Sequence, residues 1–392
     1  MLTQARELKF LRLLYFLFGF MIMAWVPRFA ELKANLGLSN GEFGSLISIA
    51  AIGSLISLMS FGHLVHKYGV KIVMQLATLA LALSMITLVQ TQSTFLFLIV
   101  NIVLGGSISA FHISINSQGF SFQDRNMRQV ITQLSGVWST GALATSVVAG
   151  LLVDRISLAL HITVLSIAVF IAMNYVINAM TLSLIQANVN PEKDYKFSDL
   201  FRGFEIDTVV SAGLICAIML EFSIGDWASI FVKENMNIAG GLNTLPYILF
   251  TLAMIVGRLT IHHLIAKHSI EKLAKLGSVT AGLAFLASIF SVNAIGTNNQ
   301  VVVLIILSVG FSIAGVGSSF LGPSFMNAAN TRSKHPSAVV IGQIGVTNII
   351  LVFIMRWVIA WTAQLTSLTL ALAIPALMLL TVPLYAKVLK QV

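Results

Sequence analysis

The sequence predicts an all-α integral membrane protein with twelve transmembrane helices in two pseudo-symmetric six-helix bundles. Hydrophobic residues make up 57% of the 392-residue chain and charged residues only 9%, whereas roughly a quarter of a soluble domain is charged. Apolar runs of about 18 or more residues recur along the chain, each long enough to cross a ~30 Å hydrocarbon core as a helix. The runs are continuous and lack the alternation of barrel strands, so helices are expected.

Twelve spans follow from these runs. They cover 8–30, 40–61, 72–90, 94–121, 129–152, 159–185, 207–234, 244–266, 272–292, 299–328, 337–360 and 365–387. No small-residue cleavage site follows the first run, so we expect a retained helix and not a signal peptide. The single cysteine, Cys216, excludes an intramolecular disulfide.

The net charge of +9 would suggest nucleic-acid binding if the basic residues shared one soluble face. The basic residues are instead concentrated in the loops on one side of the predicted membrane. With the N-terminus placed inside, five of the 23 lysines and arginines fall on the outer side, namely Arg28, Lys33, Arg155, Lys233 and Arg356. The excess of basic residues inside predicts that both termini are cytoplasmic. The bilayer is therefore an expected partner, and nucleic acid is not.

The longest polar stretch, 186–206, lies near the midpoint of the chain and carries charges of both signs, as expected of a cytoplasmic linker. It divides the chain into an N-terminal six-helix bundle, 1–185, and a C-terminal six-helix bundle, 207–392. The two halves are also similar. Shifted by 200 residues, "LVHKYGVKIV" (64–73) falls on "LIAKHSIEKL" (264–273), and both segments join the second and third spans of their half. Paired halves of this kind form many secondary transporters.

The decapeptide "GHLVHKYGVK" (62–71) resembles the signature loop between the second and third helices of the major facilitator superfamily, G-x-L-x-D-R-x-G-R-[RK]. His66 occupies the acidic position of that motif. In the family the acid helps to lock the inner gate, so the histidine implies that the lock is lost or is pH-dependent. Alternatively, these histidines are interfacial polar residues. The resemblance and its second-half counterpart, "GRLTIHHLIAK" (257–267), imply the cytoplasmic gating residues Gly62, His66, Lys67, Gly69, Lys71, Arg258 and His262.

Three further segments resemble a fucose-permease-like branch of this superfamily: "WVPRFAELKANLGLSNGEFG" (25–44), "HISINSQG" (112–119) and "GDWASIFV" (225–232). In the second of them His112 replaces an aspartate of the relatives. The fifth span lacks the Gly-Pro element that is typical of drug–proton antiporters, which disfavours multidrug efflux. The resemblance implies alternating-access transport of a small polar solute, either sugar-like or an organic anion, across a bacterial inner membrane.

Charged residues inside a membrane span are costly and indicate function. Glu221 lies 14 residues past Asp207, or about 21 Å into a ~30 Å core, and is expected to face a cavity. Asp226, about 28 Å along the same helix, is expected at the outer surface. Arg28 and Arg356 are expected either to reach the headgroups or to pair with one of these acids or with an anionic substrate.

Family resemblance extends the set of site residues, because the first, fourth, seventh and tenth helices line the cavity in facilitators. The substrate-path residues implied are Trp25, Arg28, His112, Asn116, Glu221, Trp227 and Asn327, with weaker support for Gln133, Trp138 and Asn348. Asp226 and Arg356 are added to these candidates because of their charge inside the spans. Asn116 follows His112 by one helical turn and shares its face. The candidates for proton coupling are Glu221, His112 and Asp226, since burial favours the neutral form of a carboxyl group.

The resulting hypothesis is a proton-coupled secondary transporter that acts as a monomer on a small-molecule substrate. The alternatives are a transporter-like sensor or scaffold that binds ligand without net transport, and an efflux facilitator. The sequence contains no nucleophile–base pair or phosphate-binding loop, so an enzyme is not expected. Neither half shows the ligand spacing of a known metal site, so no metal or cofactor is expected.

Overall fold

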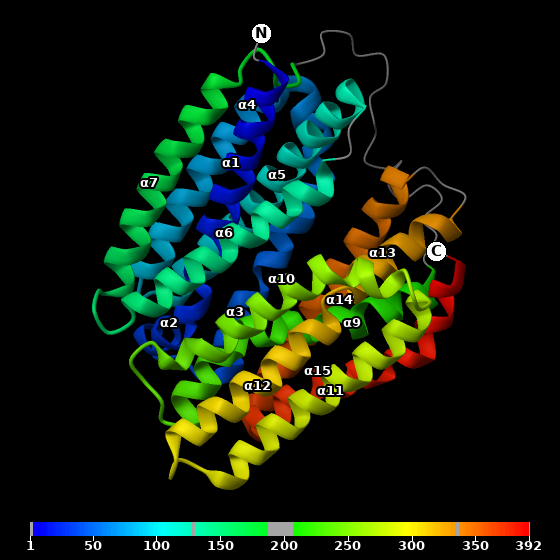
Figure 1. Ribbon diagram of the computed structural model, residues 1–392. Helices are drawn as coiled ribbons and strands as arrows, with labels where there is room; N and C mark the ends of the chain where they lie inside the picture. Colours follow the sequence, from blue (N-terminus) through cyan, green and yellow to red (C-terminus); the bar gives the residue numbers. More distant parts are fainter. Residues whose placement is uncertain (1–2, 128–129, 187–206, 334–336, 392) are drawn as a thin grey trace. The chain divides into compact units, whose positions relative to one another are not determined.

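The computed structural model describes residues 3–127, 130–186, 207–333 and 337–391 (Figure 1). Within these ranges, twelve helical segments are long and apolar enough to cross a membrane, which confirms the predicted all-α membrane fold. The observed spans begin or end a few residues away from the predicted limits; the first, for example, covers Gln4–Leu36. Beyond Gln186, the predicted linker lies outside the described residues.

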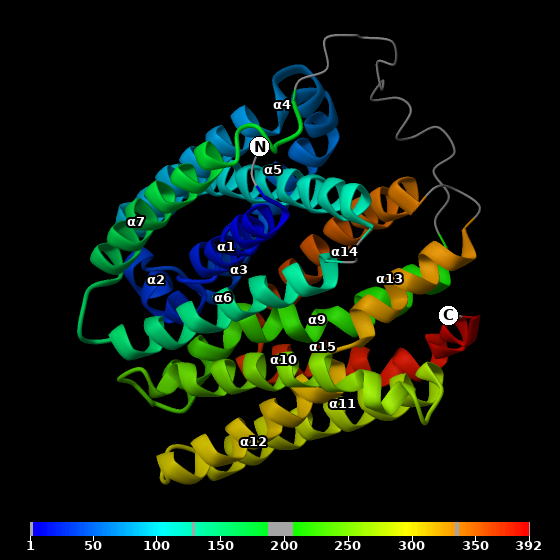
Figure 2. The ribbon, with the colours of Figure 1, turned by 45° about the horizontal axis from the view of Figure 1, so that its top comes forward.

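The first of two compact units, here called unit 1, comprises Met1–Trp25 and Ile49–Gly203. Its helix α1 packs against α5, α6 and α7, while α4 packs against α5 and α7 (Figures 1 and 2). The helices of unit 1 are α1 (Gln4–Ile22), α4 (Ala50–Gln90), α5 (Thr94–Asn126), α6 (Ile131–Leu152) and α7 (Leu158–Ala179).

Unit 2 comprises Val26–Ser48 and Phe204–Val392. Within it α12 packs against α10 and α11, and α15 packs against α9 and α11 (Figure 2). Its elements are η1 (Val26–Arg28), α2 (Phe29–Leu36), α3 (Asn40–Ser48), α9 (Thr208–Ile230), η2 (Phe231–Asn235), η3 (Leu242–Thr244), α10 (Leu245–Ile265), α11 (Ile270–Ile295), α12 (Gln300–Ser318), α13 (Leu321–Arg332), α14 (Ser337–Leu365), α15 (Leu368–Tyr385) and η4 (Ala386–Gln391).

The segment Val26–Ser48, here called the crossover segment, belongs by sequence to the N-terminal half but by its contacts to unit 2. It is bounded by two helix interruptions, at 23–25 and at Ile49. Its α3 packs against α14, and a Cβ atom at Gly44 would overlap the Cβ of Ala360. Glycine is therefore needed at position 44 for the two helices to approach this closely.

The predicted gating loop at 62–71 lies inside α4, which contains the second part of the second span and the whole third span. Only Gly69 departs from helical geometry, with φ 77° and ψ 161°. This region of the backbone map is open to glycine and almost closed to other residues. The next residue, Val70, donates its N–H to the carbonyl oxygen of Ile185 at 3.0 Å. The glycine of the motif thus makes the sharp break between two helices.

Each unit joins the beginning of its first span to the end of its fourth span by an ion pair. In unit 1, Arg125 contacts Glu7 at 2.6 Å; in unit 2, Arg332 contacts Asp207 at 2.7 Å. The two pairs occupy equivalent places in the span order and have the same chemistry. This correspondence supports the duplication that the sequence comparison suggested.

Candidate functional site

In unit 1, a hydrogen-bonded chain of polar side chains joins α1 to α5. The Tyr15 hydroxyl donates to Asn116 Oδ1 at 2.7 Å, and Asn116 Nδ2 lies 3.0 Å from His112 Nε2. Since Asn116 Oδ1 accepts from Tyr15, its amide nitrogen is the donor toward His112, and the imidazole Nε2 accepts. His112 and Asn116 therefore share a helix face, as predicted, and Tyr15 holds the orientation of the amide.

A second polar contact in unit 1 joins α1 to α6. Arg12 Nη2 donates to Gln133 Oε1 at 2.8 Å. Arg12 Nε and Trp138 Nε1 are buried and have no hydrogen-bond partner among the described residues. Neither Arg12 nor Tyr15 is among the site residues predicted from the sequence, where Arg12 contributes only to the excess of basic residues on the inner side. Arg12 lies eight residues past Gln4, the first residue of α1, which is about 12 Å along the helix, and this depth could have identified it.

Unit 2 holds a buried ion pair between α9 and α14. Arg356 donates to both carboxylate oxygens of Asp226, at 2.6 and 2.7 Å, and its guanidinium carbon lies 5.3 Å from the centre of the Phe222 ring. Asp226 is only 3% exposed, because α2 and α14 pack against α9. Its predicted place near the outer face of the membrane stays a prediction.

Glu221, on the same helix as Asp226, has a looser contact. Its carboxylate oxygens lie 3.4 and 3.5 Å from Arg258 Nη2, and its side chain is 43% exposed. Arg258 also donates from Nε to the carbonyl oxygen of Ser319 at 3.0 Å. Arg258, which the resemblance placed at the gate, thus serves as the partner of Glu221. Arg28 instead contacts Glu31, at 2.6 Å.

The remaining predicted site residues are dispersed. Trp227 is 1% exposed and packs edge-on against Phe43, with ring centres 6.2 Å apart. Trp25 is buried, Asn348 is half-buried and Asn327 is exposed. The substrate-path role of these residues stays a prediction.

The gating residues are only partly covered by the described side chains. Lys67 Nζ lies 5.1 Å from the centre of the Tyr68 ring, and the ring centres of His262 and His263 are 3.8 Å apart. The surroundings of Gly62 and the side chain of His66 lie outside the described part of the chain. Across the described residues there is no group of three or more metal-ligating side chains.

The chain is similar to two bacterial membrane proteins over most of its length. It is 25% identical over 378 residues to an uncharacterized MFS-type transporter of Yersinia pestis, covering 96% of this chain and 94% of that protein. It is also 20% identical over 326 residues to the membrane protein MosC of Rhizobium meliloti, covering 82% of this chain and 75% of MosC.

Solved structures share the fold at low sequence identity. A mutant of the nucleoside transporter NupG has a TM-score of 0.76 at 14% identity, covering 98% of this chain and 99% of that one. The D-xylose-proton symporter has a TM-score of 0.72 at 13% identity, with coverages of 98% and 97%. The sequence model of the Major Facilitator Superfamily matches residues 11–355. The chain therefore belongs to the Major Facilitator Superfamily and is a membrane transporter, not an enzyme.

Proposed function

We propose that the protein is a secondary active transporter that moves a small polar solute by alternating access and couples this movement to protons. The observation that carries the proposal is the concentration of paired polar groups inside the spans of both units. Placing a charge at the centre of a membrane helix costs roughly 2.5–3.5 kcal/mol, and such residues mark substrate and ion pathways. The Asp226–Arg356 and Glu221–Arg258 contacts each join two spans.

The chemistry of unit 1 supports a hydroxylated or carboxylated solute. Among the described residues no acidic side chain contacts Arg12, whose hydrogen bond goes to the neutral Gln133. A buried guanidinium N–H and an indole N–H favour acceptor oxygens such as those of hydroxyl or carboxylate groups. A nucleoside transporter and a xylose symporter among the structural neighbours are consistent with a sugar-like solute.

Glu221 is the carboxylate best suited to carry the proton. Its side chain is accessible, and its contact with Arg258 is long, so protonation would break one weak ion pair. Asp226 is held by two short bonds from Arg356, which suits the positioning of Arg356 better than the exchange of a proton. His112 is a second candidate for the proton, because its imidazole ends the Tyr15–Asn116 chain.

The crossover segment belongs by sequence to residues 1–185 but contacts unit 2. If residues 1–185 move as one bundle during alternating access, this segment must separate from the rest of unit 2 in some step of the cycle. Three polar contacts hold it. Lys33 pairs with Glu234 at 2.7 Å, the N–H of Asn40 donates to Gln364 at 3.0 Å, and Trp361 Nε1 donates to Ser45 at 3.1 Å. We place this segment on the outer side, with both termini in the cytoplasm, from the distribution of basic residues.

The proposal is tested by reconstitution into vesicles with an imposed pH gradient and a panel of sugars, nucleosides and sugar acids. Wild-type protein is expected to accumulate one of these solutes only with the gradient present. Glu221→Gln should retain solute exchange and lose gradient-driven accumulation, whereas the exposed loop variant Asp154→Asn should behave as wild type. Accumulation by Glu221→Gln at the wild-type level would reject the proton assignment.

The same measurement separates the alternatives. A sensor or scaffold would be stabilised by a solute in a thermal-shift assay, because a ligand that binds only the folded state raises its stability. It would nevertheless fail to accumulate that solute in vesicles. An efflux facilitator would show accumulation only when the gradient is imposed in the opposite direction.

A further inference from the structure

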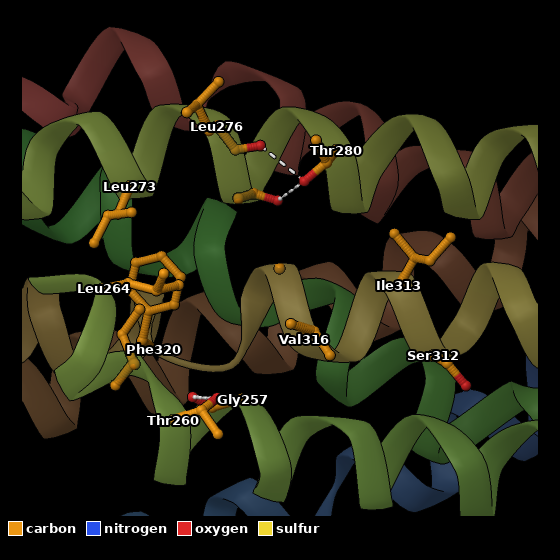
Figure 3. A pocket seen from close by; sticks show the side chains of 13 residues that line it. Gly257, Thr260, Leu264, Leu273, Leu276, Thr280, Ser312, Ile313, Val316 and Phe320 are labelled. Carbon is orange, nitrogen blue, oxygen red and sulfur yellow. Dashed lines mark hydrogen bonds between the residues drawn. The ribbon is translucent and has the colours of Figure 1, made fainter. Parts of the chain in front are cut away.

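A groove of about 470 Å³ lies between α10, α11 and α12 of unit 2. Figure 3 shows Leu264, Leu273 and Phe320 gathered at one end, with Ser312 and Ile313 at the other. The hydroxyl groups in the groove are already bonded to the backbone of their own helices. Thr280 donates to the carbonyl oxygen of Leu276 at 2.8 Å and Ser312 to that of Ser308 at 2.7 Å. The groove therefore presents an almost wholly apolar surface to an occupant.

A basic rim lies at the Leu264 end, where the loop 266–269 joins α10 to α11. Lys267, His268 and Lys272 are exposed there. Lys272 lies one helical turn before Leu276, which lines the groove, so both side chains emerge from the same face of α11. Within the described residues no acidic side chain pairs with Lys267 or Lys272, whereas the neighbouring Lys275 contacts Glu271 at 2.6 Å.

We propose that this groove is a binding site for an anionic phospholipid, with one acyl chain along α10–α11–α12 and the phosphate on Lys267 and Lys272. An acyl chain suits a groove without free hydrogen-bonding groups. Unpaired lysines at its mouth suit a negative headgroup, since basic pockets between helices at the cytoplasmic surface attract anionic lipids. The long, flexible lysine side chains can reach the headgroup level while their aliphatic parts stay in contact with the helices.

Unit 1 contains a similar groove, of about 400 Å³, between α5 and the two parts of α4 that precede and follow Gly69. Its residues Gly53, Ser60 and Leu76 lie 204 positions before Gly257, Leu264 and Thr280 of unit 2, four positions more than the 200-residue shift that aligns the two loop segments.

The groove of unit 1 also has a lysine, Lys67, near the end formed by Leu64 and Tyr68, but this lysine already contacts an aromatic ring. Lys67 Nζ lies over the ring of Tyr68, which lines that groove. The same construction thus appears in both units, so a groove with a lysine at one end is a repeated feature of the fold. Unit 2 is the stronger binding site, because its two lysines are available.

The test uses the purified full-length chain in detergent, titrated with phosphatidylglycerol or phosphatidylcholine and followed by native mass spectrometry. Phosphatidylglycerol is expected to bind more tightly. The double variant Lys267→Gln/Lys272→Gln should weaken phosphatidylglycerol binding by about fivefold per lysine removed, with phosphatidylcholine unaffected. The matched control Lys9→Gln/Arg155→Gln removes two exposed basic residues of unit 1 that do not line the groove and should leave both affinities unchanged.

A second pair of variants tests the acyl-chain part of the site. Thr280→Phe adds a ring inside the groove and is expected to reduce phosphatidylglycerol binding. Leu283→Phe, at an exposed position of the same helix outside the groove, should have no effect. Equal affinity for the two lipids, or unchanged binding by either the double lysine variant or Thr280→Phe, would overturn the proposal.

Discussion

The two units hold their polar groups in different ways. Unit 1 joins its first span to the fourth and fifth by hydrogen bonds that involve neutral partners, from Tyr15 to Asn116 and from Arg12 to Gln133. Unit 2 instead pairs acids with arginines, as at Asp226–Arg356 and Glu221–Arg258. Both units nevertheless have the same kind of ion pair at the beginning of the first span. The two units are thus alike at the ends of these spans and different within them.

From this difference we propose that the two units have different roles in transport. A set of hydrogen-bond donors and acceptors with one guanidinium is suited to recognising a polar solute. A carboxylate that is weakly paired to an arginine is suited to exchanging a proton, because the arginine keeps its charge whether or not the acid is ionised. We therefore place solute recognition mainly in unit 1 and proton coupling in unit 2.

The largest effect is expected at the buried pair of unit 2. Asp226→Asn leaves the Arg356 guanidinium without its counter-charge, and breaking a buried pair in this way costs about 3–5 kcal/mol of unfolding free energy. The matched change in unit 1, Tyr15→Phe, removes one neutral hydrogen bond and should cost about 1 kcal/mol. Unfolding of the purified proteins in mixed micelles with increasing denaturing detergent measures both values.

The double variant Asp226→Leu/Arg356→Met separates loss of the pair from loss of packing. Replacing both partners by apolar residues of similar size is often close to neutral, so this variant should regain most of the lost stability. Equal losses for Asp226→Asn and Tyr15→Phe would contradict the distinction drawn between the units.

A smaller effect on stability is expected where the crossover segment packs against the rest of unit 2. Gly44→Ala places a methyl group against Ala360 and the Trp227 ring, and overpacking of this kind costs about 1–3 kcal/mol. In unit 1, a Cβ added at Gly136 of α6 would meet no atom within 4 Å, so Gly136→Ala should be neutral or stabilising by up to ~1 kcal/mol. A thermal-unfolding comparison of the two variants measures the difference, and destabilisation of both to the same extent would count against the close α3–α14 packing.

The spans were predictable because the bilayer imposes a length and an apolar composition on every helix that crosses it. The Asn116–His112 contact was predictable for a similar reason, since residues four apart on a helix are neighbours. The resemblance at Gly69 also pointed to a real constraint, because the backbone there has a positive φ.

Contacts between distant segments were not predictable in the same way. The burial of Asp226 depends on which helices lie beside α9, and hydropathy along one helix carries no information about its neighbours. The contact of Arg12 with Gln133 could not be predicted for a related reason. Near the predicted inner surface an arginine contributes to the orientation signal, whether it faces lipid headgroups or, as here, contacts a glutamine on another helix. The packing of the crossover segment against α14 depends on the absence of a side chain at Gly44. Composition alone cannot distinguish this glycine from small residues that make no such close contact.

The smallest effect concerns the ion pair between Asp207 and Arg332, at the beginning of the seventh span. Partial burial acts to raise the pKa of Asp207, but hydrogen bonds from Arg332 and the Val210 N–H, together with the Arg332 charge, outweigh it and lower the pKa. A lowered pKa in the folded state gives stability that is present above the usual aspartate pKa of 3.8 and is lost as the pH falls through the folded value. Both side chains are about one-third exposed, so Arg332→Gln should cost no more than ~1 kcal/mol at neutral pH. This difference from wild type should shrink on acidification. Stability measured from pH 7 down to acidic pH tests the assignment, and a deficit that stays constant over this range would show that Arg332 acts through packing and not through Asp207.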